Sequence, residues 1–316
     1  MGKFKELLAS QNQLILHGAL GTELESRGYD VSGNLWSAKY LIENPQAIKD
    51  IHKDYLLAGS DILTTSSYQA TIPGLAQVGI DENEAERLIK LTVQLAIEAR
   101  DEVWETLTDD EKNARPYPLI SGDVGPYAAF LADGSEYTGD YKGISKKELR
   151  DFHRPRIQWL LEAGAEMLAL ETIPNAVETQ ALLELLEEEF PAVEAYISFT
   201  SQDGSTISDG TAIEEVAKWV DGSQQVLAIG INCSKPQFIA SFLEKISGQT
   251  DKPLVTYPNS GEVYDGATQT WTSSPDHSHT LLENTKEWQK QGAKVVGGCC
   301  RTRPADIATL AKAFRS

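Results

Sequence analysis

The sequence predicts a single (β/α)8 barrel, also called a TIM barrel, that spans residues 1–316. Eight short runs rich in apolar and β-branched residues alternate with longer runs that have helical spacing. This alternation is typical of a parallel sheet whose strands are joined by helices. Eight such units in a chain of 316 residues fit the size of a closed barrel. No linker, low-complexity tract or short repeat divides the chain.

The eight strands and eight helices are expected in strict alternation. The strands are expected at 14–17, 61–65, 118–122, 167–171, 195–200, 226–232, 253–257 and 294–298. The helices are expected at 45–58, 82–104, 146–163, 175–189, 211–220, 236–246, 278–291 and 304–314. Asn44-Pro45 and Ser145 are helix-start signals, and Gly59 and Gly164 lie where helices should end. The stretches 123–143 and 260–277 are then loops at the carboxyl ends of the strands, where such barrels carry their active sites.

An open, doubly wound sheet is the alternative fold. It is disfavoured because no Gly-x-Gly-x-x-Gly motif follows an early strand. The turn after the first strand, residues 18–22, contains only two glycines.

Composition excludes several classes of protein. Hydrophobic residues make up 41% of the chain and charged residues 24%, which is close to an ordinary globular protein. No apolar run reaches the roughly 18–20 residues of a membrane span, and the N-terminus has no signal-peptide pattern, so we expect a cytoplasmic protein. The net charge of −19 disfavours nucleic acid and anionic membranes as partners. It favours solubility and, more weakly, a cationic ligand.

All three cysteines follow predicted strands. Cys233 comes after the sixth strand, and Cys299 and Cys300 come after the eighth. Because these strands are two apart in a barrel, their ends lie near each other and the three thiolates could meet. Three thiolates suit Zn²⁺ and leave a fourth position open, as in catalytic zinc sites. Without a Cys-x-x-Cys pair, three buried cysteines beside a glycine turn remain the alternative.

A metal held by three thiolates is a poor Lewis acid but can hold a fourth thiolate at neutral pH. The chemistry that this arrangement favours is alkylation of a thiol rather than hydrolysis.

Several motifs resemble those of the homocysteine S-methyltransferase family. They are His17–Thr22 (HGALGT), Glu171–Pro174 (ETIP), Gly230–Cys233 (GINC) and Gly297–Cys300 (GGCC). Further segments at 35–38, 67–71, 124–127, 131–137 and 257–262 are similar to the bacterial and plant-type branch. The resemblance covers roughly residues 10–315.

The resemblance implies one Zn²⁺ per chain, held by Cys233, Cys299 and Cys300. The thiolate of L-homocysteine would take the open position and attack the methyl group of a sulfonium donor, S-methylmethionine or S-adenosylmethionine, and methionine would form. Glu171 would bind the ammonium group of the substrate, and we expect it to be charged at pH 7. The resemblance does not distinguish between the two donors.

One residue departs from the family pattern. The motif after the first strand usually begins with an aspartate that helps to bind the amino group, but here the residue is His17. A neutral imidazole can accept a hydrogen bond but supplies no fixed negative charge. His17 could instead contact the zinc, or be a packed, hydrogen-bonded histidine.

The other expected substrate ligands rest on weaker signals. Thr64 and Ser66 share one face of a strand and could bind the substrate carboxylate, assisted by the backbone at Gly18 and Ala19. Asn232 could orient the substrate or the neighbouring sulfur, or simply stabilise a turn. Four aromatic residues could face a sulfonium cation or merely pack: Trp36, Tyr68, Tyr127 and Trp271.

Three rival functions remain at this point. Use of betaine as the donor is disfavoured by the local motifs. Cobalamin-dependent methionine synthesis is disfavoured because few residues follow Cys300. A non-catalytic zinc- or amino-acid-binding protein on the same barrel is the rival from a different class. The oligomeric state is not predicted.

Overall fold

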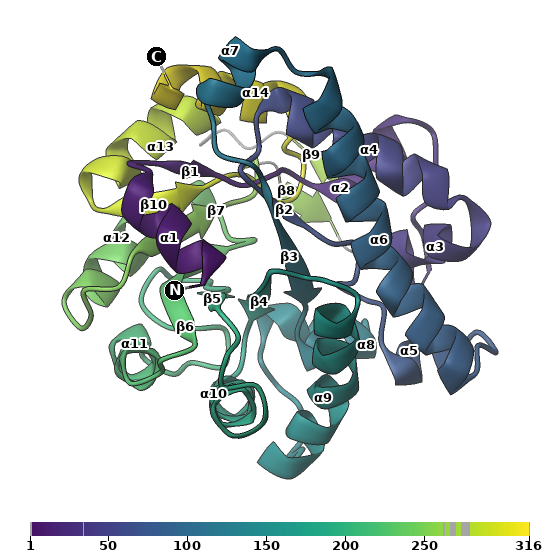
Figure 1. Cartoon of the computed structure of the whole chain (residues 1–316). Helices are drawn as coiled ribbons and strands as arrows, with labels where there is room; N and C mark the ends of the chain where they lie inside the picture. Colours follow the sequence, from purple (N-terminus) through teal and green to yellow (C-terminus); the bar gives the residue numbers. More distant parts are fainter. Residues whose placement is uncertain (1, 34, 262, 266–269, 273–278, 316) are drawn as a thin grey trace.

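The computed structural model describes residues 2–33, 35–261, 263–265, 270–272 and 279–315. Eight parallel strands form one sheet in the order β1-β10-β7-β6-β5-β4-β3-β2, so the predicted barrel is confirmed (Figure 1). The strands of this sheet are β1 Leu14–Ile15, β2 Ile62–Thr64, β3 Leu119–Val124, β4 Met167–Ile173, β5 Ala195–Phe199, β6 Val226–Asn232, β7 Leu254–Tyr257 and β10 Ala293–Val296. A separate antiparallel pair consists of β8 Val263–Asp265 and β9 Thr270–Thr272.

Helices cover the outside of the barrel and one of its ends. They are α1 Lys3–Ser10, α2 Leu20–Ser26, α3 Tyr40–Glu43, α4 Pro45–Ala58, α5 Ile72–Ala76, α6 Glu82–Thr106, α7 Asp109–Asn113, α8 Tyr127–Leu131, α9 Lys146–Glu162, α10 Ala176–Glu189, α11 Ile213–Asp221, α12 Pro236–Ser247, α13 Leu281–Lys290 and α14 Pro304–Arg315, with 3₁₀ turns η1 Trp36–Lys39 and η2 Ser135–Tyr137. None of the described helices is long and apolar enough to cross a membrane.

The helix boundaries follow from local chemistry. The Asn44 side chain accepts a hydrogen bond from Ala47 N at the start of α4, and Pro45 fits the first helical position. Gly59 ends α4 with φ +109°, in the left-handed region that favours glycine. Ser145 forms a reciprocal capping box with Glu148 at the start of α9. These signals explain why the predicted and observed boundaries agree closely here.

Strands β1 and β2, at the two ends of the sheet order, are joined by hydrogen bonds of Asp61. Asp61, just before β2, donates from its N–H to Ile15 O over 2.7 Å, and its Oδ2 accepts from Ile15 N over 2.9 Å. Arg315 forms an ion pair with the other oxygen of the same carboxylate. These bonds join β2 to β1, so the barrel is closed between them.

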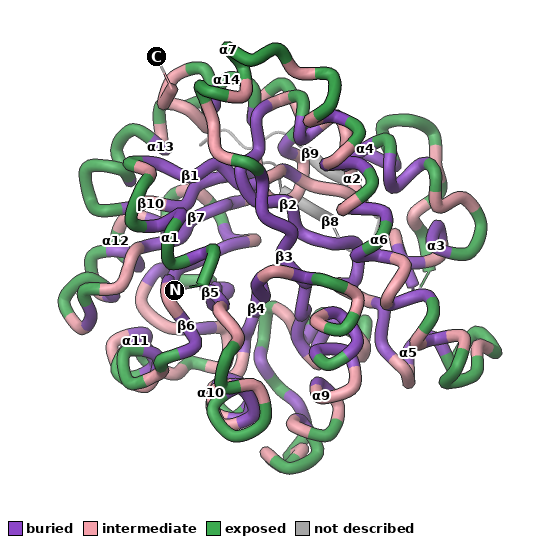
Figure 2. Tube along the Cα trace, viewed as in Figure 1, coloured by how far each residue is buried: buried purple, intermediate pink, exposed green. Residues whose placement is uncertain are grey.

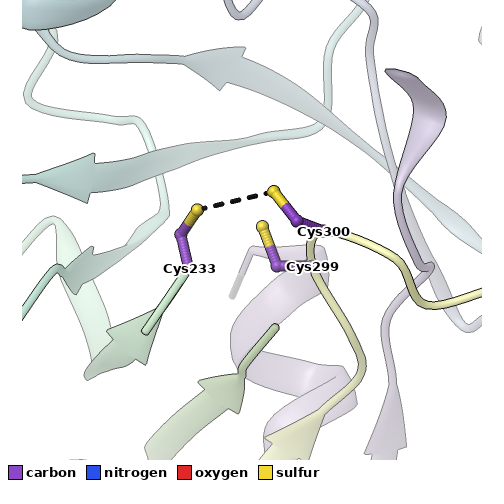
Figure 3. A group of neighbouring side chains, drawn as sticks. All are labelled: Cys233, Cys299 and Cys300. Carbon is purple, nitrogen blue, oxygen red and sulfur yellow. Dashed lines mark hydrogen bonds between the residues drawn. The ribbon is translucent and has the colours of Figure 1, made fainter. Parts of the chain in front are cut away.

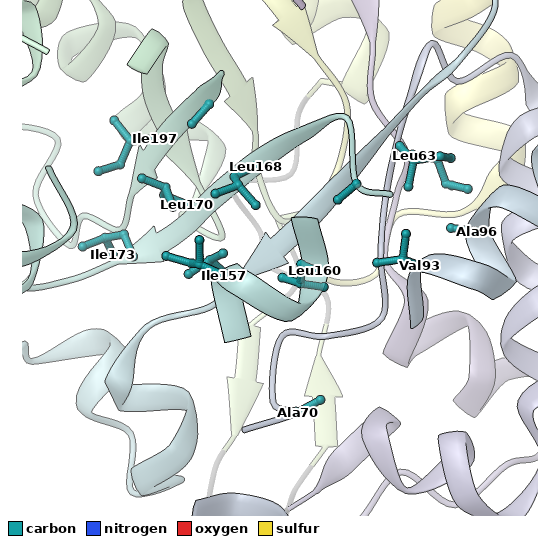
Figure 4. Close-up of a cluster of buried hydrophobic side chains, with 14 of the residues drawn as sticks. Leu63, Ala70, Val93, Ala96, Ile157, Leu160, Leu168, Leu170, Ile173 and Ile197 are labelled. Atoms are coloured by element: carbon teal, nitrogen blue, oxygen red, sulfur yellow. The ribbon is translucent and has the colours of Figure 1, made fainter. Parts of the chain in front are cut away.

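Two apolar layers stabilise the barrel. The outer layer packs helices against strands, and its members include Ile157 and Leu160 of α9 beside Leu168 of β4 (Figure 4). The strands are buried along their length while the outward faces of the helices are exposed (Figure 2).

The inner layer fills the barrel and is covered at one end by α1, which the sequence analysis did not predict. Phe4, Leu7 and Leu8 of this helix belong to the same apolar cluster as the inward-facing residues of the strands. Phe4 N also donates to Glu194 Oε2 over 2.8 Å. The amino-terminal end of the barrel is therefore packed with apolar side chains, whereas the carboxyl-terminal end holds the polar residues described next.

Candidate active site

The three cysteines converge at the carboxyl-terminal end of the barrel, as the sequence analysis predicts. Their sulfur atoms all lie within 4.8 Å of one another, and the Sγ atoms of Cys233 and Cys300 are 3.8 Å apart (Figure 3). None of the three forms a disulfide. Three sulfurs at about 2.3 Å from one tetrahedral ion would lie about 3.8 Å apart, so the cluster fits a metal such as zinc.

The three half-buried thiols differ in the direction in which their neighbours shift the pKa. The bonds from Cys233 and Cys299 hold the pKa of Cys300 below its ordinary value, whereas the bonds to Cys299 and Cys300, together with burial, raise the pKa of Cys233. The thiol protons leave when a cation binds, because a metal ligates the thiolate form.

The backbone around Cys299 and Cys300 is fixed by close packing. A Cβ on Gly298 would lie 2.3 Å from Thr302 Oγ1, so only glycine fits beside this side chain. Thr302 Oγ1 in turn donates to Cys299 O over 2.6 Å. Cys300 N donates to Asn259 Oδ1 over 3.2 Å. Glycine is therefore required at position 298 because the Thr302 side chain packs against its Cα, and not because of its φ, which lies outside the left-handed region.

A cavity of about 160 Å³ adjoins the three cysteines. The predicted residues that line it are His17, Gly18, Thr64, Ser66 and Glu171, in addition to Cys233, Cys299 and Cys300. The described residues that line it include no lysine or arginine. The cavity therefore suits a ligand that carries positive charge.

Glu171 lies at the base of this cavity and is only 9% exposed. Its Oε2 accepts a hydrogen bond from the Tyr257 hydroxyl over 2.9 Å, and Tyr257 lies 2.5 Å from Ser198 Oγ, which therefore donates to it. Burial raises the pKa of Glu171 to about 8, and the neighbouring Cys299 adds to this rise. Burial thus disfavours the charged form of Glu171 in the free cavity, and the expectation that Glu171 is charged at pH 7 stays a prediction for the site with its ligands bound.

Asn232 is fully buried and bonds the end of β6 to the end of β4. Its Oδ1 accepts from Thr172 N over 2.9 Å, and its Nδ2 donates to Thr172 Oγ1 over 2.8 Å. Thr172 has φ +63° and Cys233 has φ +47°, both unusual for residues other than glycine. Asn232 does not belong to the cavity lining among the described residues, so its direct contact with substrate stays a prediction.

His17 follows β1 and points its ring toward aromatic neighbours. Its Nδ1 lies 2.5 Å from Gly18 O, which assigns the proton to Nδ1, and its ring stands edge-on to Tyr55 at 6.0 Å. Burial lowers the pKa of His17, so the imidazole is neutral at neutral pH. These contacts agree with the alternative that His17 is a packed, hydrogen-bonded histidine. With the proton on Nδ1, its Nε2 atom can accept a hydrogen bond. Among the described residues, His17 does not belong to the cluster of cysteines that could hold a metal ion.

The hydroxyls of Thr64 and Ser66 are buried and lack a hydrogen-bond partner among the described residues. Both line the cavity, as does Gly18. A Cβ on Gly18 would lie 2.9 Å from the Tyr55 hydroxyl oxygen, so this close approach requires glycine. Ala19 N donates to Thr302 O over 3.3 Å and is not free to bind a ligand.

Aromatic residues surround the mouth of the cavity. Trp36 and Tyr68, both named in the sequence analysis, belong to its lining. Tyr127 does not, because its ring packs against Phe130, Tyr141 and Phe152. Trp271 lies in β9, and its side chain lies outside the described residues.

Among the lining residues to which the sequence analysis assigned no role are two acids and two tyrosines: Asp123, Glu136, Tyr137 and Tyr257. Asp123 and Tyr257 could have been found, because alternation along β3 and β7 places both on the inner face near a strand end. Glu136 and Tyr137 come from η2, whose path depends on tertiary contacts.

Comparison with known proteins gives a consistent result. The homocysteine S-methyltransferase family model matches residues 14–314. A homocysteine S-methyltransferase of Bacillus subtilis is 46% identical over 316 residues, which is 100% of this chain and 99% of that protein. A homocysteine S-methyltransferase of Escherichia coli is 46% identical over 97% of this chain and 96% of that protein.

Solved structures agree with this result. The metallated form of the homocysteine methyltransferase MmuM from Escherichia coli has a TM-score of 0.86 at 43% identity, covering 98% of this chain and 99% of that chain. The apo form of the same protein gives a TM-score of 0.76. This chain belongs to the homocysteine S-methyltransferase family.

Proposed function

We propose that this protein transfers a methyl group from S-methylmethionine or S-adenosylmethionine to L-homocysteine and forms methionine. The observation that carries the proposal is the convergence of three cysteine sulfurs and Glu171 in one cavity that lacks basic side chains. Membership of the family supports the same reaction. We also propose that residues 1–316 act as one domain and that the enzyme works in the cytoplasm, where thiols stay reduced.

Zn²⁺ is the metal that best fits the site. Cys233, Cys299 and Cys300 would hold it, one ion per chain, because three thiolates with tetrahedral spacing suit this ion. When bound, zinc would supply positive charge that lowers the pKa of the homocysteine thiol, so that its proton is released to solvent at neutral pH. No side chain of the cavity then has to act as a general base.

The remaining residues bind and orient the substrate. Glu171, held in place by Tyr257, is placed to accept hydrogen bonds from the ammonium group. The unpartnered hydroxyls of Thr64 and Ser66 can donate to the carboxylate. Gly18 lets the backbone at the cavity wall pack closely against Tyr55 and Thr302. Asn232 acts indirectly, because it fixes Thr172 next to Glu171 and its own neighbour Cys233.

The methyl donor carries a positive charge, and the cavity mouth can accommodate it. Trp36, Tyr68 and Tyr137 line the cavity together with Glu136, and aromatic rings and a carboxyl group both attract a sulfonium ion. A bond forms between the homocysteine sulfur and the methyl carbon while the bond to the donor sulfur breaks, and its electron pair stays on the donor. Holding both sulfurs in line makes this displacement effectively unimolecular.

A donor panel with homocysteine tests the proposal. Purified protein loaded with zinc is incubated with S-methylmethionine, S-adenosylmethionine or betaine, and methionine is quantified. We expect methionine from at least one sulfonium donor and none from betaine. Turnover with betaine alone would contradict the donor assignment. Bound zinc without methionine from any donor would instead favour a binding protein.

A further inference from the structure

Asp123 is a buried acid in the cavity for which the proposed reaction gives no role. It lies on β3, is 3% exposed and belongs to the same lining as Glu171 and the three cysteines. No described residue forms a hydrogen bond with its Oδ1. Leaving a buried polar atom unpaired costs about 1–3 kcal/mol, more when the group is charged. The neighbouring carboxyl group of Glu171 can satisfy this oxygen only by sharing a proton with it, whereas a bound cation could donate to both groups.

The position of Asp123 is fixed by its own backbone. Asp123 N donates to Thr65 Oγ1 over 2.9 Å, and Asp123 O accepts from Ser67 Oγ over 2.8 Å. Thr65 Oγ1 and Ser67 Oγ are also 2.8 Å apart. These bonds use the segment after β2 to anchor the end of β3. The backbone that carries the carboxyl group is thus held in place before any ligand arrives.

The ionisable groups around Asp123 are mostly acidic, so a positively charged ligand would stabilise its carboxylate form. Glu171 on the adjacent strand β4 is close enough for the two carboxyl groups to share a proton, and burial together with the charge of Glu171 raises the pKa of Asp123. Cys299 adds negative charge when ionised. Arg156 of α9 opposes this rise, but its guanidinium donates to the carbonyl oxygens of Tyr68 and Gly125. Among the described residues no ion pair joins Asp123 to a basic side chain.

We propose that Asp123 is a second carboxylate for the ammonium group of homocysteine, acting together with Glu171. The inference rests on the proposed function, since it names a further contact to the same substrate. An ammonium group has three N–H donors and can donate to both carboxylates at once. The proton that Asp123 and Glu171 share is released to solvent when this cation replaces it. His17, which is neutral, supplies no charge for this purpose.

The test compares two ligands that differ only in the amino group. Homocysteine and 4-mercaptobutanoate share the thiol and the carboxylate, but 4-mercaptobutanoate has no ammonium. Binding of each to the zinc-loaded protein is measured by calorimetry for wild type, Asp123→Asn and Asp123→Ser. Asp101→Asn is the matched control, because Asp101 lies on α6 outside the cavity. Zinc content and thermal unfolding confirm that each variant is folded.

We expect Asp123→Asn to raise the Kd of homocysteine at least tenfold and to leave the Kd of 4-mercaptobutanoate unchanged or lower. Asp101→Asn should change neither. Equal losses for both ligands would show a structural role and overturn the proposal, as would an unchanged Kd for homocysteine. Asp123→Ser gives the same comparison if Asp123→Asn does not fold. If wild type itself does not bind homocysteine, the proposed function fails first and this inference falls with it.

Discussion

Replacing Glu171 by glutamine removes a charge from the cavity while keeping nearly the same shape. The glutamine oxygen can still accept the hydrogen bond that Tyr257 donates over 2.9 Å, so the side chain should stay in position. What is lost is a charge-assisted hydrogen bond to the ammonium group, worth about 1.5–3 kcal/mol. This corresponds to about one to two decades in the Kd of homocysteine. The effect should approach its full size at about pH 9 and above, where a carboxyl group with a pKa of about 8 is almost fully ionised.

The pH dependence provides a second signature of the same contact. Because the pKa of Glu171 is raised to about 8 by burial, the free site holds a proton below that pH and binding must release it. The ratio of the homocysteine Kd of Glu171→Gln to that of wild type should therefore decrease about tenfold for each pH unit below 8. Calorimetric titration of both proteins from pH 6 to pH 9 measures this ratio.

Two variants at position 17 complete the comparison. His17→Asn keeps a neutral polar group and should weaken homocysteine binding far less than Glu171→Gln. His17→Asp adds a carboxylate and should be tolerated or tighten binding. If His17→Asn is the most damaging change and His17→Asp is inactive, His17 has a role of its own. The reasoning that gives the ammonium to Glu171 would then be refuted.

Three further predictions concern the metal, the acid stability and the end of the barrel. Cys299→Ala should lose zinc and methionine formation while circular dichroism stays unchanged; full zinc content and turnover would reject the site. Burial lowers the pKa of His52 to about 3, so below pH 6.5 the unfolded chain binds a proton that the folded chain does not. The free energy of unfolding should therefore decrease as the pH is lowered from 6.5 toward 3. Urea unfolding of His52→Gln should show a shallower fall, and an equal slope would contradict this cause. Phe4→Ala should cost about 3–5 kcal/mol in urea unfolding while Lys5→Ala costs almost nothing; a loss below about 1 kcal/mol would show that α1 is not part of the core.

The barrel was predictable because its signals are local. Helix α4 begins and ends where expected, since Asn44 and Gly59 satisfy its terminal groups within a few residues. Helix α1 was missed because its apolar face packs against residues from all around the barrel, including Tyr196, which is nearly two hundred positions away. A short amphipathic run alone does not indicate that it covers the end of a barrel.

The candidate site was predictable to the extent that it follows strand ends. Parallel strands bring their carboxyl ends together, so Cys233, Cys299 and Glu171 could be placed in one cavity from order alone. The protonation of Glu171 could not, because it depends on burial and on Cys299 and Tyr257 in space. Tyr137 could not either, because it reaches the cavity from a 3₁₀ turn within a long loop.

The placement of acids in the cavity follows from the cations that the reaction requires. A metal ion held by the three cysteines, the substrate ammonium and a sulfonium donor would all be positive, and the lining contains no described basic side chain that would repel them. Three thiolates match the metal, and aromatic rings with Glu136 match the sulfonium. The ammonium needs a charge of its own. In the family motif an aspartate after the first strand helps to supply it, whereas here that position is the neutral His17 and an acid with an unpaired oxygen stands on β3 instead. With a carboxylate at position 123 in place of one at position 17, the proposed site keeps two carboxylates for one ammonium and leaves the three cysteines unchanged.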